Sequence, residues 1–144
     1  MPLHQHKKFV RSTEPPGRLR IQPRDVELLR DLADYRFLDT DQILALHHRG
    51  LRNIQRRLRS LYHLGFVDRP NAQRFFALPG SSIIYSLGEK GAEVLSLDEA
   101  TRKTKEVAFP YLAHAMMISR FRSILTLALR EYSDKPKISK ENVN

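Results

Sequence analysis

The chain has 144 residues, of which 41% are hydrophobic, enough for one domain with a modest core. A formal net charge of +9 favours a polyanionic partner, either a nucleic acid or an anionic surface. The sequence contains no cysteine, which excludes disulfide scaffolds and cysteine-ligated zinc. Its polar, basic start does not resemble a signal peptide, so we expect a soluble cytoplasmic protein.

Residues 1–22 are predicted to form a basic, flexible arm ahead of the folded domain. They hold five Lys or Arg residues against one acid, and Pro15-Pro16-Gly17 prevents a continuous helix. The arm is either a disordered leader or a source of phosphate and minor-groove contacts. In the second case Lys7 and Lys8 are candidate contacts to the DNA backbone.

Two helices are predicted next. The first spans Pro23 to Tyr35, because proline suits the first helical position and apolar residues follow at helical spacing. Its expected buried residues are Val26, Leu29, Leu32 and Ala33. The second runs from Asp41 to about His47, with Thr40 as its N-cap. Its expected buried residues are Ile43, Leu44 and Leu46.

A third helix, Leu51 to Leu64, carries the most informative pattern in the chain. Gly50 is expected to supply the backbone freedom for the turn before it, and Gly65 to end it in a left-handed C-cap. One side is apolar and predicts a core face of Leu51, Ile54, Leu58, Leu61 and Tyr62. The other side is basic, and residues 42–67 hold five arginines without a single Asp or Glu. Such a helix favours a partner with regularly spaced negative charge, as in DNA recognition.

Two strands are predicted after this helix, at Phe66–Arg69 and Ile83–Leu87, joined by a loop rich in turn formers. Strands joined in this way directly after a helix-turn-helix form a wing. Arg69 and Arg74 then become candidate contacts to the DNA backbone. A fourth helix, Gly88–Leu95, is expected to cap the sheet.

The remaining chain is predicted as a linker over 97–108, a long helix over 109–132 and a flexible tail over 133–144. Pro110 suits the first turn of the long helix. Its apolar stripe is wider than one packing contact needs, so we expect part of it to pair with a second subunit. The dimer-interface candidates are Met117, Phe121, Ile124 and Ala128. Two arginines interrupt the stripe, so we expect no membrane span.

These elements predict an α+β fold, mainly α with a small β-hairpin. It comprises a winged helix-turn-helix domain over residues 23–96 and a long C-terminal helix.

Four runs of sequence carry a family resemblance. The chain resembles the winged-helix domain of replication-relaxation family proteins in PRDVELLRDLADYRFLDTDQILAL, RNIQRRLRSLYHLGFVDRP and IIYSLGEKGAEVL. The later run LAHAMMISRFRSILTLAL is similar to the helix that follows that domain. The resemblance covers roughly Ile21 to Glu131 and implies a DNA-binding protein tied to plasmid or mobile-element replication and relaxation. The pieces L-x-x-L-x-x-L-G-F-V-x-R and Y-x-L-x-x-x-G also occur across MarR-like and PadR-like regulators.

Binding of duplex DNA is therefore the leading hypothesis, with helix 51–64 in the major groove and the wing on the backbone. Arginine can bond guanine and asparagine can bond adenine through paired hydrogen bonds. The base-contact candidates are Arg52, Asn53, Arg56 and Gln55. The backbone-contact candidates are Arg49, Arg57, Arg59, Arg69, Arg74, Lys7 and Lys8. A two-fold dimer would read two half-sites about 34 Å apart.

Other functions remain open from sequence. The domain could recruit replication or DNA-transfer proteins, or regulate transcription in response to a ligand, as MarR-like and PadR-like proteins do. A nicking relaxase would need a tyrosine nucleophile and a metal held by histidines. Tyr111 and Tyr132 have no acid or metal site nearby in sequence, and the pair His4 and His6 lies in the arm. We therefore predict no enzyme activity, no cofactor and no metal.

Overall fold

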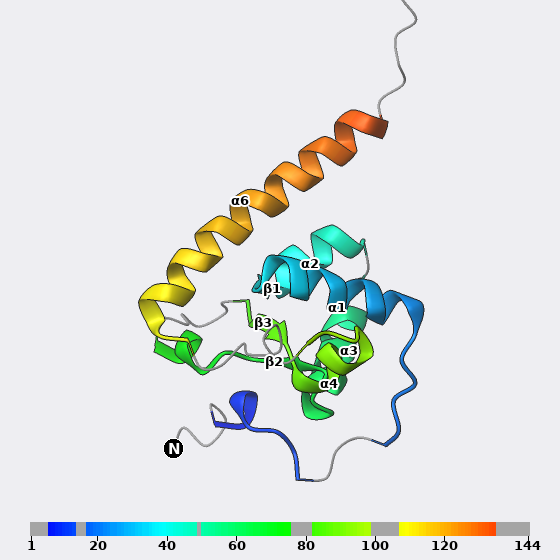
Figure 1. Cartoon of the computed structure of the whole chain (residues 1–144), viewed down its shortest axis with the longest axis vertical. Coiled ribbons are helices and arrows are strands. Elements are labelled where there is room, and N and C mark those ends of the chain that lie inside the picture. Colours follow the sequence, from blue (N-terminus) through cyan, green and yellow to red (C-terminus); the bar gives the residue numbers. More distant parts are fainter. Residues whose placement is uncertain (1–5, 14–16, 49, 76–81, 99–106, 135–144) are drawn as a thin grey trace, which may run out of the picture.

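Helices account for most of the described chain, and three short strands form one small sheet (Figure 1). The computed structural model describes residues 6–13, 17–48, 50–75, 82–98 and 107–134. The helices are α1 (Pro23–Tyr35), α2 (Thr40–His47), α3 (Leu51–His63), α4 (Glu89–Val94) and α6 (Phe109–Asp134). The strands are β1 (Leu38–Asp39), β2 (Val67–Asp68) and β3 (Ile84–Leu87), and short 3-10 turns occupy His6–Phe9 and Asn71–Phe75.

This arrangement confirms the predicted α+β class, with a small antiparallel sheet and a long C-terminal helix. Each helix lies within two residues of its predicted range, and α6 extends to Asp134. Residues 99–106 of the predicted linker and 135–144 of the predicted tail lie outside the described residues.

The sheet has the strand order β1-β3-β2, and both pairings are antiparallel. Val67 lies opposite Leu87 in the predicted hairpin, and Leu38 lies opposite Tyr85 on the other side of β3. The strand β1 was not predicted, because two residues are too short to show an alternating pattern. It places α2 directly beside the sheet.

The N-cap of α2 is Asp39, which corrects the prediction of Thr40. The Asp39 side chain accepts a hydrogen bond from the backbone N–H of Gln42 at 2.8 Å. The Gln42 side-chain oxygen in turn accepts from the backbone N–H of Asp39 at 2.9 Å. This reciprocal capping box is buried, and Thr40 becomes the first helical residue.

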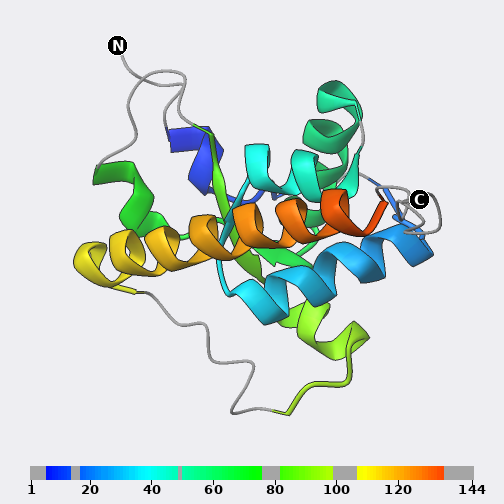
Figure 2. The same ribbon diagram turned by 90° about the horizontal axis from the view of Figure 1, so that it is seen from above.

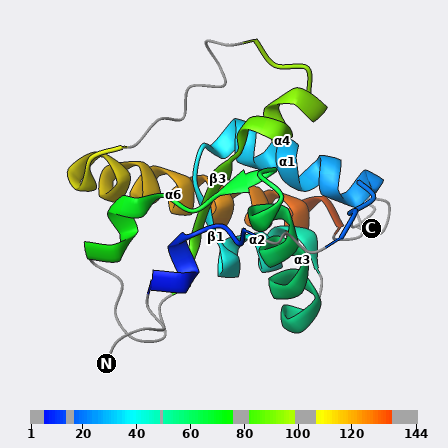
Figure 3. The same cartoon turned by 90° about the horizontal axis from the view of Figure 1, so that it is seen from below.

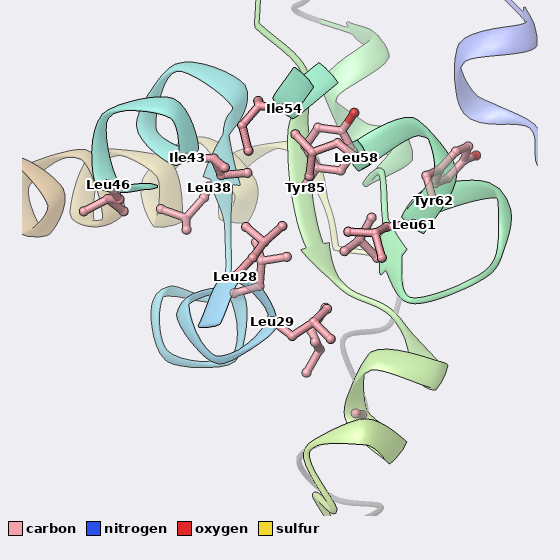
Figure 4. Packing of buried hydrophobic residues seen from close by; sticks show 14 residues of the cluster. Leu28, Leu29, Leu38, Ile43, Leu46, Ile54, Leu58, Leu61, Tyr62 and Tyr85 are labelled. Atoms are coloured by element: carbon pink, nitrogen blue, oxygen red, sulfur yellow. The ribbon is translucent and has the colours of Figure 1, made fainter. Parts of the chain in front are cut away.

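The core lies between α1, α2, α3 and the sheet (Figure 4). Its α3 members are Ile54, Leu58, Leu61 and Tyr62, as predicted. Leu51 was predicted there too, but its side chain is 49% exposed. It occupies the first residue of α3, and the covered part of the helix begins one turn later at Ile54.

The buried faces of α1 and α2 differ slightly from prediction. In α1 the buried apolar residues are Leu28, Leu29 and Leu32, whereas Val26 and Ala33 are only partly buried. In α2 Ile43 and Leu46 are buried and Leu44 is partly buried. Both helices also bury polar side chains, including Asp25 and Gln42, that hydrophobic spacing could not indicate.

The turn between α2 and α3 does not depend on glycine. The left-handed residue is His48, with φ 47° and ψ 47°, whereas Gly50 has φ −60° and ψ 137°, which any residue can adopt. The expectation for Gly50 was therefore wrong. The expectation for Gly65 is confirmed, because its φ of 86° follows the last turn of α3.

One face of α6 docks on the domain against α2, β1 and the Asn71–Phe75 turn (Figure 2). At the end of α1, the hydroxyls of Tyr35 and Thr126 are hydrogen-bonded. The buried side chains on that face are Leu112, Met116, Ser119 and Ser123. The Gln42 amide nitrogen donates to the hydroxyls of Ser119 and Ser123, each at 3.1 Å. By length and composition alone α6 also meets the minimum for a membrane-crossing helix, a test that core helices of soluble proteins pass as well.

Candidate nucleic-acid interface

The outward face of α3 is basic and free of acids along its whole length. Its exposed polar side chains are Arg52, Asn53, Gln55, Arg56 and Arg59. They lie on the side opposite the buried residues Ile54, Leu58 and Leu61, since a residue turns about 100° from the last in a helix. Figures 1 and 3 show α3 and α6 on different sides of the domain.

The base-contact candidates therefore share one exposed surface. Arg52, Asn53 and Arg56 occupy the first two turns of α3, and Gln55 lies at the edge of their face. Within the described residues, Arg52, Arg56 and Arg59 form no ion pair with any acid. Their charge is thus uncompensated locally, which suits contact with an external anion.

The N-terminus of α3 begins at the N-cap Gly50, which has no side chain to accept from the first backbone N–H groups. Those N–H groups carry the positive end of the helix dipole. A phosphate placed there could accept from them. Arg49, a predicted backbone contact just before this point, lies outside the described residues.

Arg57 belongs to the fold rather than to the exposed face. Its guanidinium forms an ion pair with Asp25 of α1, with an Nε–Oδ1 distance of 2.8 Å, and a second donor reaches the Arg20 carbonyl at 2.9 Å. The hydrogen bond with the fully buried Asp25 raises the pKa of Arg57. We therefore reassign Arg57 from a DNA-backbone contact to an internal ion pair.

Arg69 is also directed inward, contrary to its predicted role on the wing. Its guanidinium lies 4.2 Å from the centroid of the Tyr62 ring and 5.3 Å from that of Tyr85. It donates to the Tyr85 hydroxyl at 3.0 Å and to the Lys8 carbonyl at 2.6 Å. Burial raises the pKa of both tyrosine hydroxyls. Cation–π stacking fixes this side chain between two strands and the end of α3.

The N-terminal segment docks beside the C-terminal end of α3. Arg11 donates to the Tyr62 carbonyl at 3.0 Å and pairs with the Asp68 carboxylate. The backbone N–H of Ser12 donates to His63 Nδ1 at 3.0 Å. A cavity of about 240 Å³ lies between this segment and β2. Sequence reasoning missed the role of Arg11, because its partners lie more than 50 residues away.

The remaining candidates lie at the surface. The Lys8 and Arg74 side chains are exposed, and the Arg74 guanidinium lies 5.7 Å from the Phe9 ring centroid. The Lys7 side chain is outside the described part of the structure. All four dimer-interface candidates on α6, Met117, Phe121, Ile124 and Ala128, are exposed. Among the described residues, no group of three or more His, Asp or Glu side chains could hold a metal ion.

The fold and this surface define a small basic α+β protein with an arginine-rich helix on one side and a long apolar helix on another. A profile of the replication-relaxation family matches residues 29–139, more than half of the chain, and the chain belongs to that family. Membership supports a replication-related role. No curated protein and no solved structure matched the chain.

Proposed function

We propose that this protein is a winged helix-turn-helix factor that binds duplex DNA in plasmid or mobile-element replication or in transcription control. The observation that carries the proposal is the acid-free outer face of α3, where Arg52, Arg56 and Arg59 have no ion-pair partner among the described residues. A single exposed arginine is ordinarily only a solvated surface residue, but three on one helical face create a continuous positive stripe.

The order of elements supports the same proposal. Helix α2 contacts α3 across a short turn, and β2 follows α3 directly and pairs antiparallel with β3. In helix-turn-helix proteins the second helix enters the major groove, and its N-terminal residues contact base edges. In this arrangement Arg52, Asn53 and Arg56 read bases, with Gln55 at the edge.

The phosphate contacts come from residues around this helix. Arg59 lies one turn beyond the base readers, and Lys8 and Arg74 are exposed on the two 3-10 turns. Arg49 and Lys7 have the sequence positions to add to them. Contacts with about four phosphates give a slope near −3.6 for log affinity against log salt concentration. Binding is the whole activity in this proposal, without nicking.

The first experiment selects bound sequences from a random duplex pool and then measures affinity for the selected site at several salt concentrations. We expect a steep salt dependence and a loss of about 1–3 kcal/mol of binding free energy for Arg56→Ala, with relaxed specificity at one base position. Arg30→Ala is the matched control, since Arg30 is exposed on α1. It should bind like the unmodified protein.

Three outcomes would reject the proposal. Affinity that is independent of salt would exclude phosphate contacts. Equal, weak binding before and after removal of Arg52 and Arg56 would favour a protein-recruitment role instead. Specific nicking of supercoiled DNA with Mg²⁺ or Mn²⁺ would show a relaxase rather than a binding protein.

A further inference from the structure

The helix α6 has one face docked on the domain and one exposed face. The docked face buries Leu112, Met116, Ser119 and Ser123. The other face is apolar and exposed. Its large side chains are Met117, Ile118, Phe121, Ile124, Leu125, Leu129 and Tyr132. At 100° per residue this set is centred almost directly opposite the buried set, so the domain cannot cover it.

The exposed face is too large for an ordinary monomer surface. Phe121 is 69% exposed and Tyr132 is 78% exposed. A fully buried aromatic covers roughly 150–250 Å², so these two offer on the order of 300 Å² together. With the four aliphatic side chains and the methionine, the total exceeds the few hundred Å² above which exposed apolar patches mark interaction sites. A standard protein interface buries roughly 800 Å² per partner.

The charges beside this face favour an antiparallel copy of the same helix. Arg120 and Glu131 lie on one edge of the apolar face, one toward each end. Arg120 also forms a long ion pair, 3.6 Å, with Asp39 of its own chain, and its side chain stays 59% exposed on this edge. In an antiparallel pair related by a two-fold axis, each edge meets the same edge of the partner. Arg120 then approaches Glu131 of the second copy, and the reverse contact forms as well. In a parallel pair Arg120 would meet the opposite edge, which carries Arg122.

The position of these charges along α6 also supports an antiparallel pair. Arg120 and Glu131 are symmetric about the bond between Leu125 and Thr126, and the exposed apolar residues from Met117 to Tyr132 are centred about half a helical turn from it. A single two-fold axis near this point therefore brings Arg120 close to Glu131 of the second copy and also places the two apolar faces against each other. A membrane would match the apolar residues but not the paired charges on one edge.

We propose that α6 pairs with α6 of a second copy in an antiparallel, two-fold dimer whose axis passes near Leu125. The apolar face forms the interface, and the ion pairs between Arg120 and Glu131 set the direction. The DNA-binding role of α3 is not needed for this dimer, so each can fail without the other.

The first test measures mass in solution by light scattering for the full chain and for Phe121→Glu/Ile124→Glu. Both side chains are exposed, so the variant should keep the helical circular dichroism of the unmodified protein. We expect a dimer for the unmodified chain and a monomer for the variant. Val94→Glu is the matched control, because Val94 is an exposed apolar residue on α4, and it should remain dimeric.

The second test uses the absence of cysteine from the chain. Leu125→Cys should form a disulfide-linked dimer with itself under mild oxidation, since it lies near the two-fold axis. Met117→Cys alone should not, because the two copies of residue 117 lie about 24 Å apart along the helix. Mixing Met117→Cys with Tyr132→Cys should form the cross-linked pair. Efficient self-linking of Met117→Cys would indicate a parallel pair and overturn the proposal.

The third test reverses one charge. Glu131→Arg should weaken the dimer by roughly tenfold or more in dissociation constant, because it would face Arg120 of the second copy. This substitution leaves the ion pair between Arg120 and Asp39 within each chain intact. A monomeric unmodified chain that sediments with anionic phospholipid vesicles would overturn the proposal in favour of membrane binding. A monomer that does not bind vesicles would overturn it too.

Discussion

The guanidinium of Arg57 lies against the carboxylate of Asp25, which is fully buried between α1 and α3. The same carboxylate accepts from the backbone N–H of Gln22 at 2.7 Å and so also caps α1. The neighbouring Arg56 points to solvent. Two adjacent arginines in one basic run therefore have different tasks, the first at the surface and the second inside the fold.

Arg57→Ala should lower the free energy of unfolding by about 3–5 kcal/mol, since removal of one partner leaves a buried charge uncompensated. Urea denaturation followed by circular dichroism measures this loss. Arg56→Ala is the matched control and should change stability by less than about 0.5 kcal/mol, because it is an exposed substitution. Equal stability losses in the two variants would show that the Asp25 ion pair does not hold α1 on α3.

Gly91→Ala should destabilise the protein severely. A Cβ at this position would lie 2.3 Å from the Phe66 carbonyl oxygen and 2.8 Å from the Leu87 side chain. Relieving this clash would require the backbone at Phe66 to shift. We therefore expect a loss of about 3 kcal/mol or more in unfolding free energy, measured by urea denaturation. Gly50→Ala is the control, since its Cβ would meet only the Asn53 amide at 3.9 Å. A loss below about 1 kcal/mol is expected there.

The sequence predicted those parts of the fold that have a local signal. Pro23 marks the start of α1, Gly65 marks the end of α3, and the spacing of Ile54 and its neighbours shows the core face of α3. These signals depend only on residues close together in the chain. For the same reason the outward position of Arg52 and Arg56 could be predicted.

Buried polar contacts between distant segments could not be predicted in this way. Asp25 and Arg57 are 32 residues apart, and Gln42 and Ser119 are 77 residues apart. Hydrophobic periodicity alone predicts that each of these polar side chains lies at the surface. Only the packing of α1 on α3 and of α6 on α2 brings these residues together. A prediction from the arginine-rich sequence alone therefore assigned Arg57 and Arg69 to DNA contacts, although both side chains have partners within the fold.

Stability should fall as the pH is lowered through the range in which unfolded histidine becomes protonated. Burial, with the positive charges of Arg69, Arg59 and Arg11, lowers the pKa of His63 below its ordinary value of 6.5. Below about pH 6.5 His63 is therefore protonated in the unfolded chain but still neutral in the folded chain. The free energy of unfolding decreases in this range, because protonation stabilises the unfolded state. This loss continues down to the lower pKa of the folded state.

His63→Gln should reduce this pH dependence. Urea midpoints at pH 7.5 and pH 5.5 measure it, and the difference between the two should be smaller in the variant, since glutamine does not titrate. His114→Gln is the control, because His114 is exposed on α6, and it should keep the full difference. An unchanged difference in His63→Gln would assign the pH effect to other groups.

Gln42→Leu should loosen α6 from the domain before it affects the remaining helices. The amide of Gln42 donates to Ser119 and Ser123, and its oxygen accepts from the backbone N–H of Asp39. Leucine leaves that buried N–H without its partner, at a cost of about 1–3 kcal/mol in unfolding free energy.

Amide hydrogen exchange separates this effect from general destabilisation. Amides from Ser119 to Thr126 should exchange faster in Gln42→Leu by a larger factor than the core amides of α3. Gln55→Leu is the matched control, since Gln55 is exposed on α3, and its exchange pattern should equal that of the unmodified protein. If all helices of Gln42→Leu exchanged faster by one common factor, the Gln42 contacts would support the whole domain rather than the docking of α6.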